Sequence, residues 1–306
     1  MRINTAITQM LGIELPIIGA PMFLVSYPEL VAAVSNEGGI GTFPALNFRE
    51  PEELKNGIDT IRSLTSKPIG VNLILHKEHN PDWQKQLKTC LDKNVELYIA
   101  SLGTPRSLIK EVHSSGAKVF CDITTLKHAK LVAKAGCDAI IAVGSGAGGH
   151  SGNISLFSLI PYIKEETNLP VIAAGSIGTG FQILAALSLG ADAVSIGTRF
   201  IASIEARVNE NYKTMLIDSS PEEIIYTDKV TGIFSNWMKQ SLDKHPYILN
   251  GEKPPQSLEG DSKRWKDIWS AGQGVAQIKE VLSVQEIFHR IKNEYRKAHR
   301  SIPIPT

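Results

Sequence analysis

The residues best able to carry chemistry lie in the loop VGSGAGGHSG, residues 143–152, which holds five glycines and one histidine. Glycine gives up more backbone freedom on folding than any other residue, so this crowding indicates that the backbone comes close to a ligand. His150 is the one side chain of the loop that exchanges a proton near neutral pH. A lone loop histidine is more often a surface residue, but the surrounding glycines favour His150 as a catalytic residue.

Two further turns pair a glycine with a hydroxyl residue. They are Gly175-Ser176 in AAGSIGTG and Gly197-Thr198 in SIGTRF, each at the point where an apolar run ends and a helical pattern begins. Free N–H groups at the start of a helix bind phosphate, and the loops after strands 7 and 8 of an α/β barrel commonly form a phosphate site. Either turn alone is equally well explained as a tight turn. Their joint occurrence predicts a phosphate site.

Other candidate residues follow earlier apolar runs. Ala20, Pro21 and Met22 follow the first run, Asn72 closes the segment IGVN, and Asp122 closes the run 118–122. A neutral amide such as that of Asn72 can bond a polar ring atom of a flat cofactor, or it can satisfy loop backbone, and the sequence leaves both open.

The elements that must position these residues are eight short apolar runs separated by amphipathic stretches. Nearly continuous apolar runs of five or six residues are typical of parallel strands covered on both faces. Eight even strand–helix units favour a closed α/β architecture, a (β/α)8 or TIM barrel, over an open doubly wound sheet. The predicted strands are Pro16–Ala20, Gly39–Phe43, Pro68–Asn72, Val95–Ala100, Lys118–Asp122, Ala139–Val143, Val171–Gly175 and Ala193–Gly197.

The pattern changes after about residue 205. We divide the chain into a barrel of residues 1–205, an appendage of residues 206–276 near the barrel mouth, and a C-terminal segment of residues 277–306 packing back on the barrel. The appendage is charged, contains three of the four tryptophans, and is expected to be mostly helical with long loops. The apolar spacing of residues 277–297 predicts one amphipathic C-terminal helix.

Composition and motifs exclude several classes of protein. The formal net charge of +1 gives no electrostatic footprint for nucleic acid or a membrane surface, and no apolar stretch is long enough to span a bilayer. No secretory signal is evident, and three scattered cysteines form no disulfide framework, so we expect a cytoplasmic protein whose Cys121 and Cys137 are buried and inert.

Metal and nucleotide motifs are also weak. His76 and His79 lie three residues apart without a third ligand, so no metal site is predicted. The letters of residues 144–149, GSGAGG, match a dinucleotide fingerprint, but HSGN follows instead of a helix. No GxSxG elbow and no P-loop motif occurs.

These segments together resemble the nitronate monooxygenase family, which includes FMN-dependent enoyl-acyl-carrier-protein reductases and NADH:quinone reductases. The resemblance covers residues 15–200 and returns in residues 270–287. In family order, the matching segments are PIIGAPM, SNEGGIGTF, IGVN, GAGGHSG, PVIAAGSIGTG and GADAVSIGTRF.

The resemblance implies an FMN-binding TIM barrel and assigns a role to each candidate. His150 matches the histidine that the family uses as catalytic base or substrate-orienting group. Asp122 stands where relatives place varied residues close to the flavin. The remaining implied FMN contacts are Ala20, Pro21 and Met22 along the ring, Asn72 at its polar edge, Gly148 and Gly149 bordering it, and Gly175, Ser176, Gly197 and Thr198 at the phosphate.

Two departures from the family pattern bear on the substrate. Gly146 stands where the family often has a glutamate, and Ser176 replaces the second glycine of the frequent AGGI. The resemblance implies oxidation of alkyl nitronates with O2. The alternatives are an NAD(P)H-dependent reductase of a quinone or an enoyl thioester, and a catalytically silent flavin- or phosphate-binding barrel. No nucleic-acid or membrane partner is expected, and a homodimer stays open.

Overall fold

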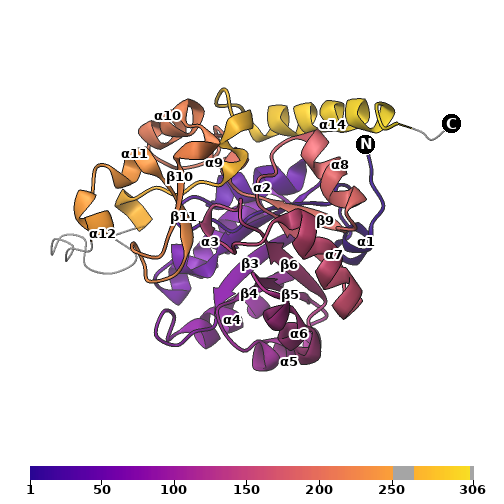
Figure 1. The fold of residues 1–306 in the computed structure, drawn as a ribbon. Coiled ribbons are helices and arrows are strands. Elements are labelled where there is room, and N and C mark those ends of the chain that lie inside the picture. Colours follow the sequence, from indigo (N-terminus) through magenta and orange to yellow (C-terminus); the bar gives the residue numbers. More distant parts are fainter. Residues whose placement is uncertain (251–264, 304–306) are drawn as a thin grey trace.

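A closed barrel of eight parallel strands forms the centre of the molecule (Figure 1). The computed structural model describes residues 1–250 and 265–303. Closure comes from β1, which pairs with β2 on one side and with β9 on the other. In barrel order the strands are β1 (Ile17–Gly19), β2 (Ile40–Pro44), β3 (Ile69–Ile74), β4 (Leu97–Ser101), β5 (Lys118–Ile123), β6 (Ala139–Val143), β8 (Val171–Ala174) and β9 (Ala193–Ile196). The predicted TIM barrel is confirmed, with strand ends shifted by at most two residues.

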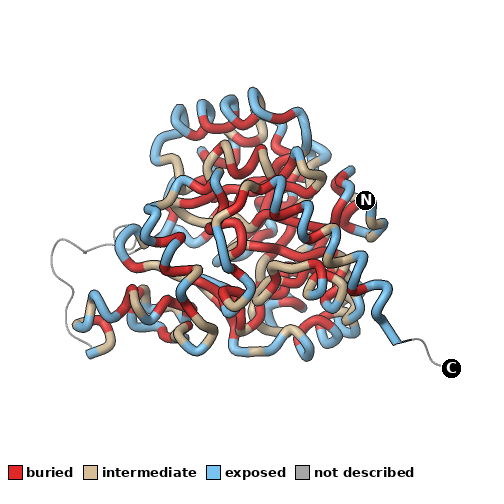
Figure 2. Tube along the Cα trace, turned by 90° about the horizontal axis from the view of Figure 1, so that it is seen from above, coloured by how far each residue is buried: buried red, intermediate tan, exposed pale blue. Residues whose placement is uncertain are grey.

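Helices cover the outside of the barrel, and their outward turns are exposed in Figure 2. Thr125 caps the start of α6 and Gly136, at φ 94°, ends it, as the sequence predicts. The barrel helices are α2 (Pro28–Asn36), α3 (Pro51–Leu64), α4 (Trp83–Asp92), α5 (Arg106–Ser114), α6 (Leu126–Ala135), α7 (Leu156–Thr167), α8 (Gly180–Ser188) and α9 (Thr198–Ile201).

One end of the barrel is closed by the N-terminal helix α1 (Ala6–Leu11). Ile7 and Leu11 of α1 join a buried cluster with alternating strand residues such as Leu97 and Ile99. Because successive strand side chains point to opposite faces, these residues share the interior face of the barrel. The interior is therefore packed at the amino ends of the strands, which leaves the carboxyl ends for a ligand.

The appendage contains a strand pair that the prediction of helices and loops lacks. β10 (Ile224–Thr227) and β11 (Ser235–Met238) are antiparallel, and β11 also pairs with β7 (Gly149–His150) of the histidine loop. Strands of four residues are too short for a clear alternating pattern, so the sequence did not reveal them. The other elements are α10 (Glu210–Asp218), η2 (Pro221–Glu223), α11 (Lys239–Leu242), α12 (Pro246–Asn250) and η4 (Gln273–Gln277).

The C-terminal helix α14 runs over Val284–Arg300, so its predicted start at residue 277 is wrong. Ser283 caps it: its side chain accepts from the Glu286 amide, and the Glu286 carboxylate accepts from the Ser283 amide. This capping box ends the preceding extended segment, in which Leu282 bridges to Ser203. α14 lies along α8 (Figure 1), where the Glu294 carboxylate accepts from the amide of Gly180 at 2.8 Å.

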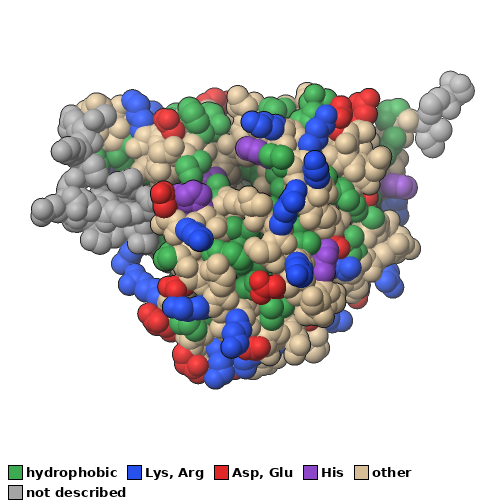
Figure 3. All heavy atoms as spheres, turned by 90° about the horizontal axis from the view of Figure 1, so that it is seen from below, with side chains coloured by type: hydrophobic (Ala, Val, Ile, Leu, Met, Phe, Trp, Pro, Cys, Tyr) green, Lys and Arg blue, Asp and Glu red, His purple; other side chains and the backbone are tan. Residues whose placement is uncertain are grey.

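The surface charges, the cysteines and the apolar helices can each be compared with the expectations from the sequence. On the face shown in Figure 3, acidic and basic side chains are interspersed. Cys90, Cys121 and Cys137 are all buried free thiols, as predicted for the burial of the last two. Within residues 1–250 and 265–303, no helix is both long and apolar enough to cross a bilayer.

Candidate active site

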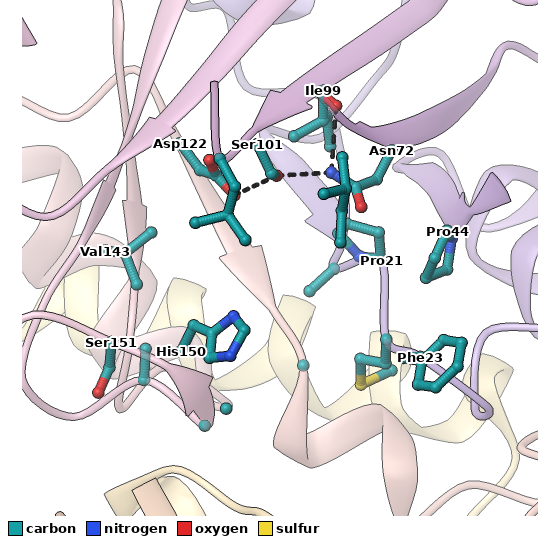
Figure 4. Close-up of a pocket in the computed structure, with 18 of the residues that line it drawn as sticks. Pro21, Phe23, Pro44, Asn72, Ile99, Ser101, Asp122, Val143, His150 and Ser151 are labelled. Atoms are coloured by element: carbon teal, nitrogen blue, oxygen red, sulfur yellow. Dashed lines mark hydrogen bonds between the residues drawn. The ribbon is translucent and has the colours of Figure 1, made fainter. Parts of the chain in front are cut away.

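One large cavity opens at the carboxyl ends of the barrel strands, with a volume of about 2160 Å³ (Figure 4). All twelve residues predicted from the sequence line it, although they come from segments up to 178 residues apart. They are Ala20, Pro21, Met22, Asn72, Asp122, Gly148, Gly149, His150, Gly175, Ser176, Gly197 and Thr198. The barrel thus brings together every one of the predicted site residues.

The wall formed after β8 and β9 is made largely of backbone. Gly175 has φ +130°, and a Cβ atom there would lie 2.9 Å from the amide nitrogen of Ala147. No other residue type fits that close approach. The Thr198 hydroxyl accepts from the Gly272 amide at 2.9 Å, and a hydroxyl that accepts one bond can still donate its own proton to an anion. This wall is suited to a phosphate group.

A chain of hydrogen bonds crosses the opposite wall, at the ends of β3, β4 and β5 (Figure 4). The Asn72 amide donates to the Ser101 hydroxyl at 2.7 Å, and that hydroxyl donates to the Asp122 carboxylate at 2.5 Å. Burial raises the pKa of Asp122 to about 6, opposed by the bond from Ser101 and by the backbone amide of Asp122. Ser101 is a polar residue at a strand end, but its link between Asn72 and Asp122 depends on strand neighbours 29 and 21 residues away and could not be predicted.

His150 lies on β7, and its ring projects into the cavity in Figure 4. The ring meets Trp265 of the appendage edge-on, with 5.4 Å between centroids. Trp265 in turn lies 4.5 Å from Trp237, which is fully buried. Aromatic contacts of this kind stabilise one ring orientation. The appendage therefore helps to determine where the imidazole points.

Further appendage residues line the cavity and were not predicted as site residues. Tyr226 and Phe234 stack at 5.0 Å and are both partly exposed at the mouth. Tyr212 and Trp269 also stack at 5.0 Å and line the same cavity. Only the tertiary fold brings these aromatic pairs to the barrel mouth, so the sequence around each carries no sign of a shared site.

The two departures from the family pattern, Gly146 and Ser176, are in contact with each other. A Cβ atom at Gly146 would lie 1.9 Å from the Ser176 hydroxyl oxygen and 3.3 Å from the side-chain oxygen of Gln273. Ser176 itself has φ 54°, and its amide donates to the Gly146 carbonyl at 3.2 Å. The side chain of Ser176 thus occupies space that any larger residue at position 146 would need.

We expect the effects of Gly146→Glu and Ser176→Gly on stability to be non-additive. Gly146→Glu should lower the free energy of unfolding more when Ser176 is present than when it is glycine, by about 1 kcal/mol or more, because contacting residues couple. Urea unfolding of the four proteins of this cycle measures the difference. Additivity within about 0.4 kcal/mol would show that the two side chains do not compete for space.

The two histidines considered as metal ligands, His76 and His79, lie side by side. The His76 and His79 rings lie 5.2 Å apart. In the described ranges, 1–250 and 265–303, no three or more His, Cys, Asp or Glu side chains are grouped so as to hold a metal ion.

The closed barrel, with a cavity at the carboxyl ends of its strands, a phosphate-suited wall and a histidine loop, defines a TIM-barrel protein built for ligand chemistry. The sequence model described as "Nitronate monooxygenase" matches residues 4–294. A probable nitronate monooxygenase of Staphylococcus aureus is 30% identical over 298 residues, covering 83% of this chain and 84% of that one. The chain belongs to the nitronate monooxygenase family, a family of oxidoreductases.

Solved structures agree with this assignment. FabK from Thermotoga maritima is 32% identical, with a TM-score of 0.84, and the match covers 97% of this chain and 98% of that one. A nitroalkane oxidase from Streptomyces ansochromogenes is 28% identical, with a TM-score of 0.81, and covers 97% of this chain and 100% of that one.

Proposed function

We propose that this chain is an FMN-dependent nitronate monooxygenase that oxidises alkyl nitronates with O2. The observation that carries the proposal is the convergence of His150, the glycine-rich wall and the Asn72–Ser101–Asp122 chain on one cavity. Similarity to a probable nitronate monooxygenase and to a nitroalkane oxidase supports the same reaction class.

The residues present fit FMN. Gly175 leaves a backbone-lined cradle that a Cβ atom would fill, and Thr198 offers a hydroxyl beside it. Ser176, Gly197 and these two residues would hold the phosphate, while Gly148, Gly149 and the segment Ala20–Met22 would border the ring. Asn72 would reach the polar edge of the ring, with Asp122 nearby. Bound FMN would supply the redox chemistry, taking electrons from the nitronate and passing them to oxygen.

His150 would act on the substrate. As an imidazolium it holds the anionic nitro group of a nitronate, and as a neutral imidazole it accepts the α-proton of a nitroalkane. The aromatic side chains of Tyr226, Phe234 and Trp265 at the mouth would exclude water from the bound substrate.

An NAD(P)H-dependent reductase acting on a quinone or an enoyl thioester is the second candidate, and the size of the cavity favours it. The cavity of about 2160 Å³ exceeds the roughly 300–1,000 Å³ of ordinary small-molecule sites, which leaves room for a second large ligand beside a mononucleotide. The TM-scores of 0.84 and 0.81 against FabK and the nitroalkane oxidase do not separate the two reactions.

An anaerobic absorbance spectrum separates these functions. The purified protein is mixed separately with propyl nitronate, NADH and NADPH, and the visible absorbance of oxidised flavin is followed. We expect a yellow protein whose flavin is reduced by the nitronate and not by either nicotinamide. Rapid bleaching by NADH or NADPH would overturn the monooxygenase in favour of the reductase. A colourless protein that binds no added FMN would point to the flavin-free barrel.

A further inference from the structure

Asn236 on β11 makes an unusual set of contacts with the histidine loop. Its side chain is only 2% exposed, and its amide nitrogen lies 2.8 Å from the Ser145 carbonyl, 2.7 Å from the Ala147 carbonyl and 3.1 Å from the Ser151 hydroxyl. Carbonyl oxygens only accept hydrogen bonds, so the amide nitrogen, and not its oxygen, must face them. One carboxamide therefore ties both sides of the loop around His150.

Backbone pairing reinforces these contacts. Asn236 pairs with Gly149 and Ser235 pairs with His150, so the residue at the tip of the loop becomes part of the appendage sheet. The Ser151 amide also donates to the Phe234 carbonyl at 3.3 Å. Three consecutive residues of the loop, 149–151, are thus paired with β11 and with Phe234, the residue before it.

A second appendage segment contacts the loop at Gly146. The Gly146 carbonyl accepts from the amides of Ser176 and Gln273, at 3.2 and 3.1 Å. A Cβ atom at Gly272 would lie 2.4 Å from that carbonyl oxygen, so the two backbones touch directly. Backbone of Gly272 also lies against Gly148, where a Cβ atom would be 2.8 Å from the Gly272 amide nitrogen. Within the loop, β11 contributes the side-chain hydrogen bonds from Asn236.

We propose that Asn236 is a positioning residue: its carboxamide fixes the conformation of loop 144–152 and so aims the His150 ring into the cavity. The inference rests on the proposed role of His150. Five glycines give this loop a large conformational entropy to lose, and two backbone pairs alone offer little to offset it. A side chain with two N–H donors satisfies two buried carbonyls at once, and an unsatisfied buried carbonyl is costly.

Asn236→Ala and Asn236→Asp test the proposal. Alanine removes the donors, and aspartate keeps the shape but presents a carboxylate, which has no proton to donate, to two carbonyl oxygens. Thr227→Val is the matched control, because Thr227 is a buried residue of the same sheet whose hydroxyl accepts from the Lys229 amide and not from the loop.

Three readouts apply to the FMN-loaded protein with propyl nitronate: the NMR signals and titration midpoint of the His150 ring, the FMN dissociation constant, and kcat and KM. We expect both Asn236 variants to shift the ring signals and the midpoint and to lower kcat about 10- to 100-fold, as a misplaced catalytic group does. Thr227→Val should change neither the His150 signals nor kcat. If these variants do not fold, Asn236→Ser, which lacks the carboxamide and introduces no buried charge, carries the same test.

Unchanged His150 signals in both variants would overturn the proposal. Failure of the proposed function gives a different result: the unaltered protein would then not turn over propyl nitronate, while the Asn236 variants would still shift the His150 signals. The spectroscopic readout thus reports on the position of the loop whether or not the nitronate is the substrate.

Discussion

His150→Ala is expected to lower kcat/KM for propyl nitronate by about 10²- to 10⁴-fold, the range typical of a positioned acid–base group. The variant should still bind FMN, because the residues assigned to the phosphate lie on other loops, after β8 and β9. Steady-state oxygen consumption measures turnover, and the flavin absorbance of the dialysed protein measures retention of the cofactor.

His128→Ala is the matched control for this experiment. His128 also lines the cavity, but it lies on α6 and is exposed. Its loss should leave kcat/KM within about twofold, since it lies apart from the glycine loop. Full turnover by His150→Ala would remove His150 from the mechanism, whereas loss of the flavin from that variant would make it a residue of cofactor binding.

Asp122→Asn is expected to change the free energy of unfolding of the FMN-free protein differently at neutral and at acidic pH. The change at neutral pH should be more stabilising than the change at pH 3.5 by about 3 kcal/mol. Burial raises the pKa of Asp122 to about 6 from its ordinary value of 3.8. Between pH 3.8 and pH 6, the Asp122 side chain is therefore protonated in the folded protein and ionised in the unfolded chain. The stability supplied by Asp122 is fully present below pH 3.8 and is lost as the pH rises through 6, and asparagine does not titrate.

Urea unfolding of both proteins between pH 3.5 and 8 measures the difference in unfolding free energy. Ser101→Ala provides a check, because the Ser101 hydroxyl donates to the Asp122 carboxylate and lowers its pKa. Without that bond, the folded-state pKa of Asp122 should rise, so the difference should level off at a higher pH and become larger. A difference that does not vary with pH would show that Asp122 keeps the same proton affinity in the folded and unfolded chain.

Much of the barrel could be predicted because each strand is a short, continuous apolar run. Such runs are buried on both faces, as Ile140 and Ile141 of β6 are, and turn residues bound them. The histidine loop and the Gly-Ser and Gly-Thr turns carried local signals too. The error at the C-terminal helix arose because Ile278 and Leu282 continue a helix-like spacing through a segment that is not helical. The pair Ser283 and Glu286 held the signal for the correct start.

The contribution of the appendage could not be predicted from the sequence. Asn236 lies in a four-residue strand, and its partners Ser145 and Ala147 are 91 and 89 residues away. Nothing local marks a buried asparagine as a donor to a distant loop. The contact between Gly146 and Ser176 was equally hidden, since each residue alone reads as an ordinary turn position.

The fit of Ser176 against Gly146 constrains the order in which this site can have changed. A chain that carried a side chain at position 146 would have no room for the present Ser176 rotamer. If Ser176 had appeared while position 146 still carried a side chain, the two side chains would have competed for one space. If Gly146 had appeared first, it would have left an empty space that Ser176 then fills. Starting from the present chain, a substitution series that changes Ser176 to glycine before it enlarges Gly146 avoids this clash, whereas the reverse order meets it.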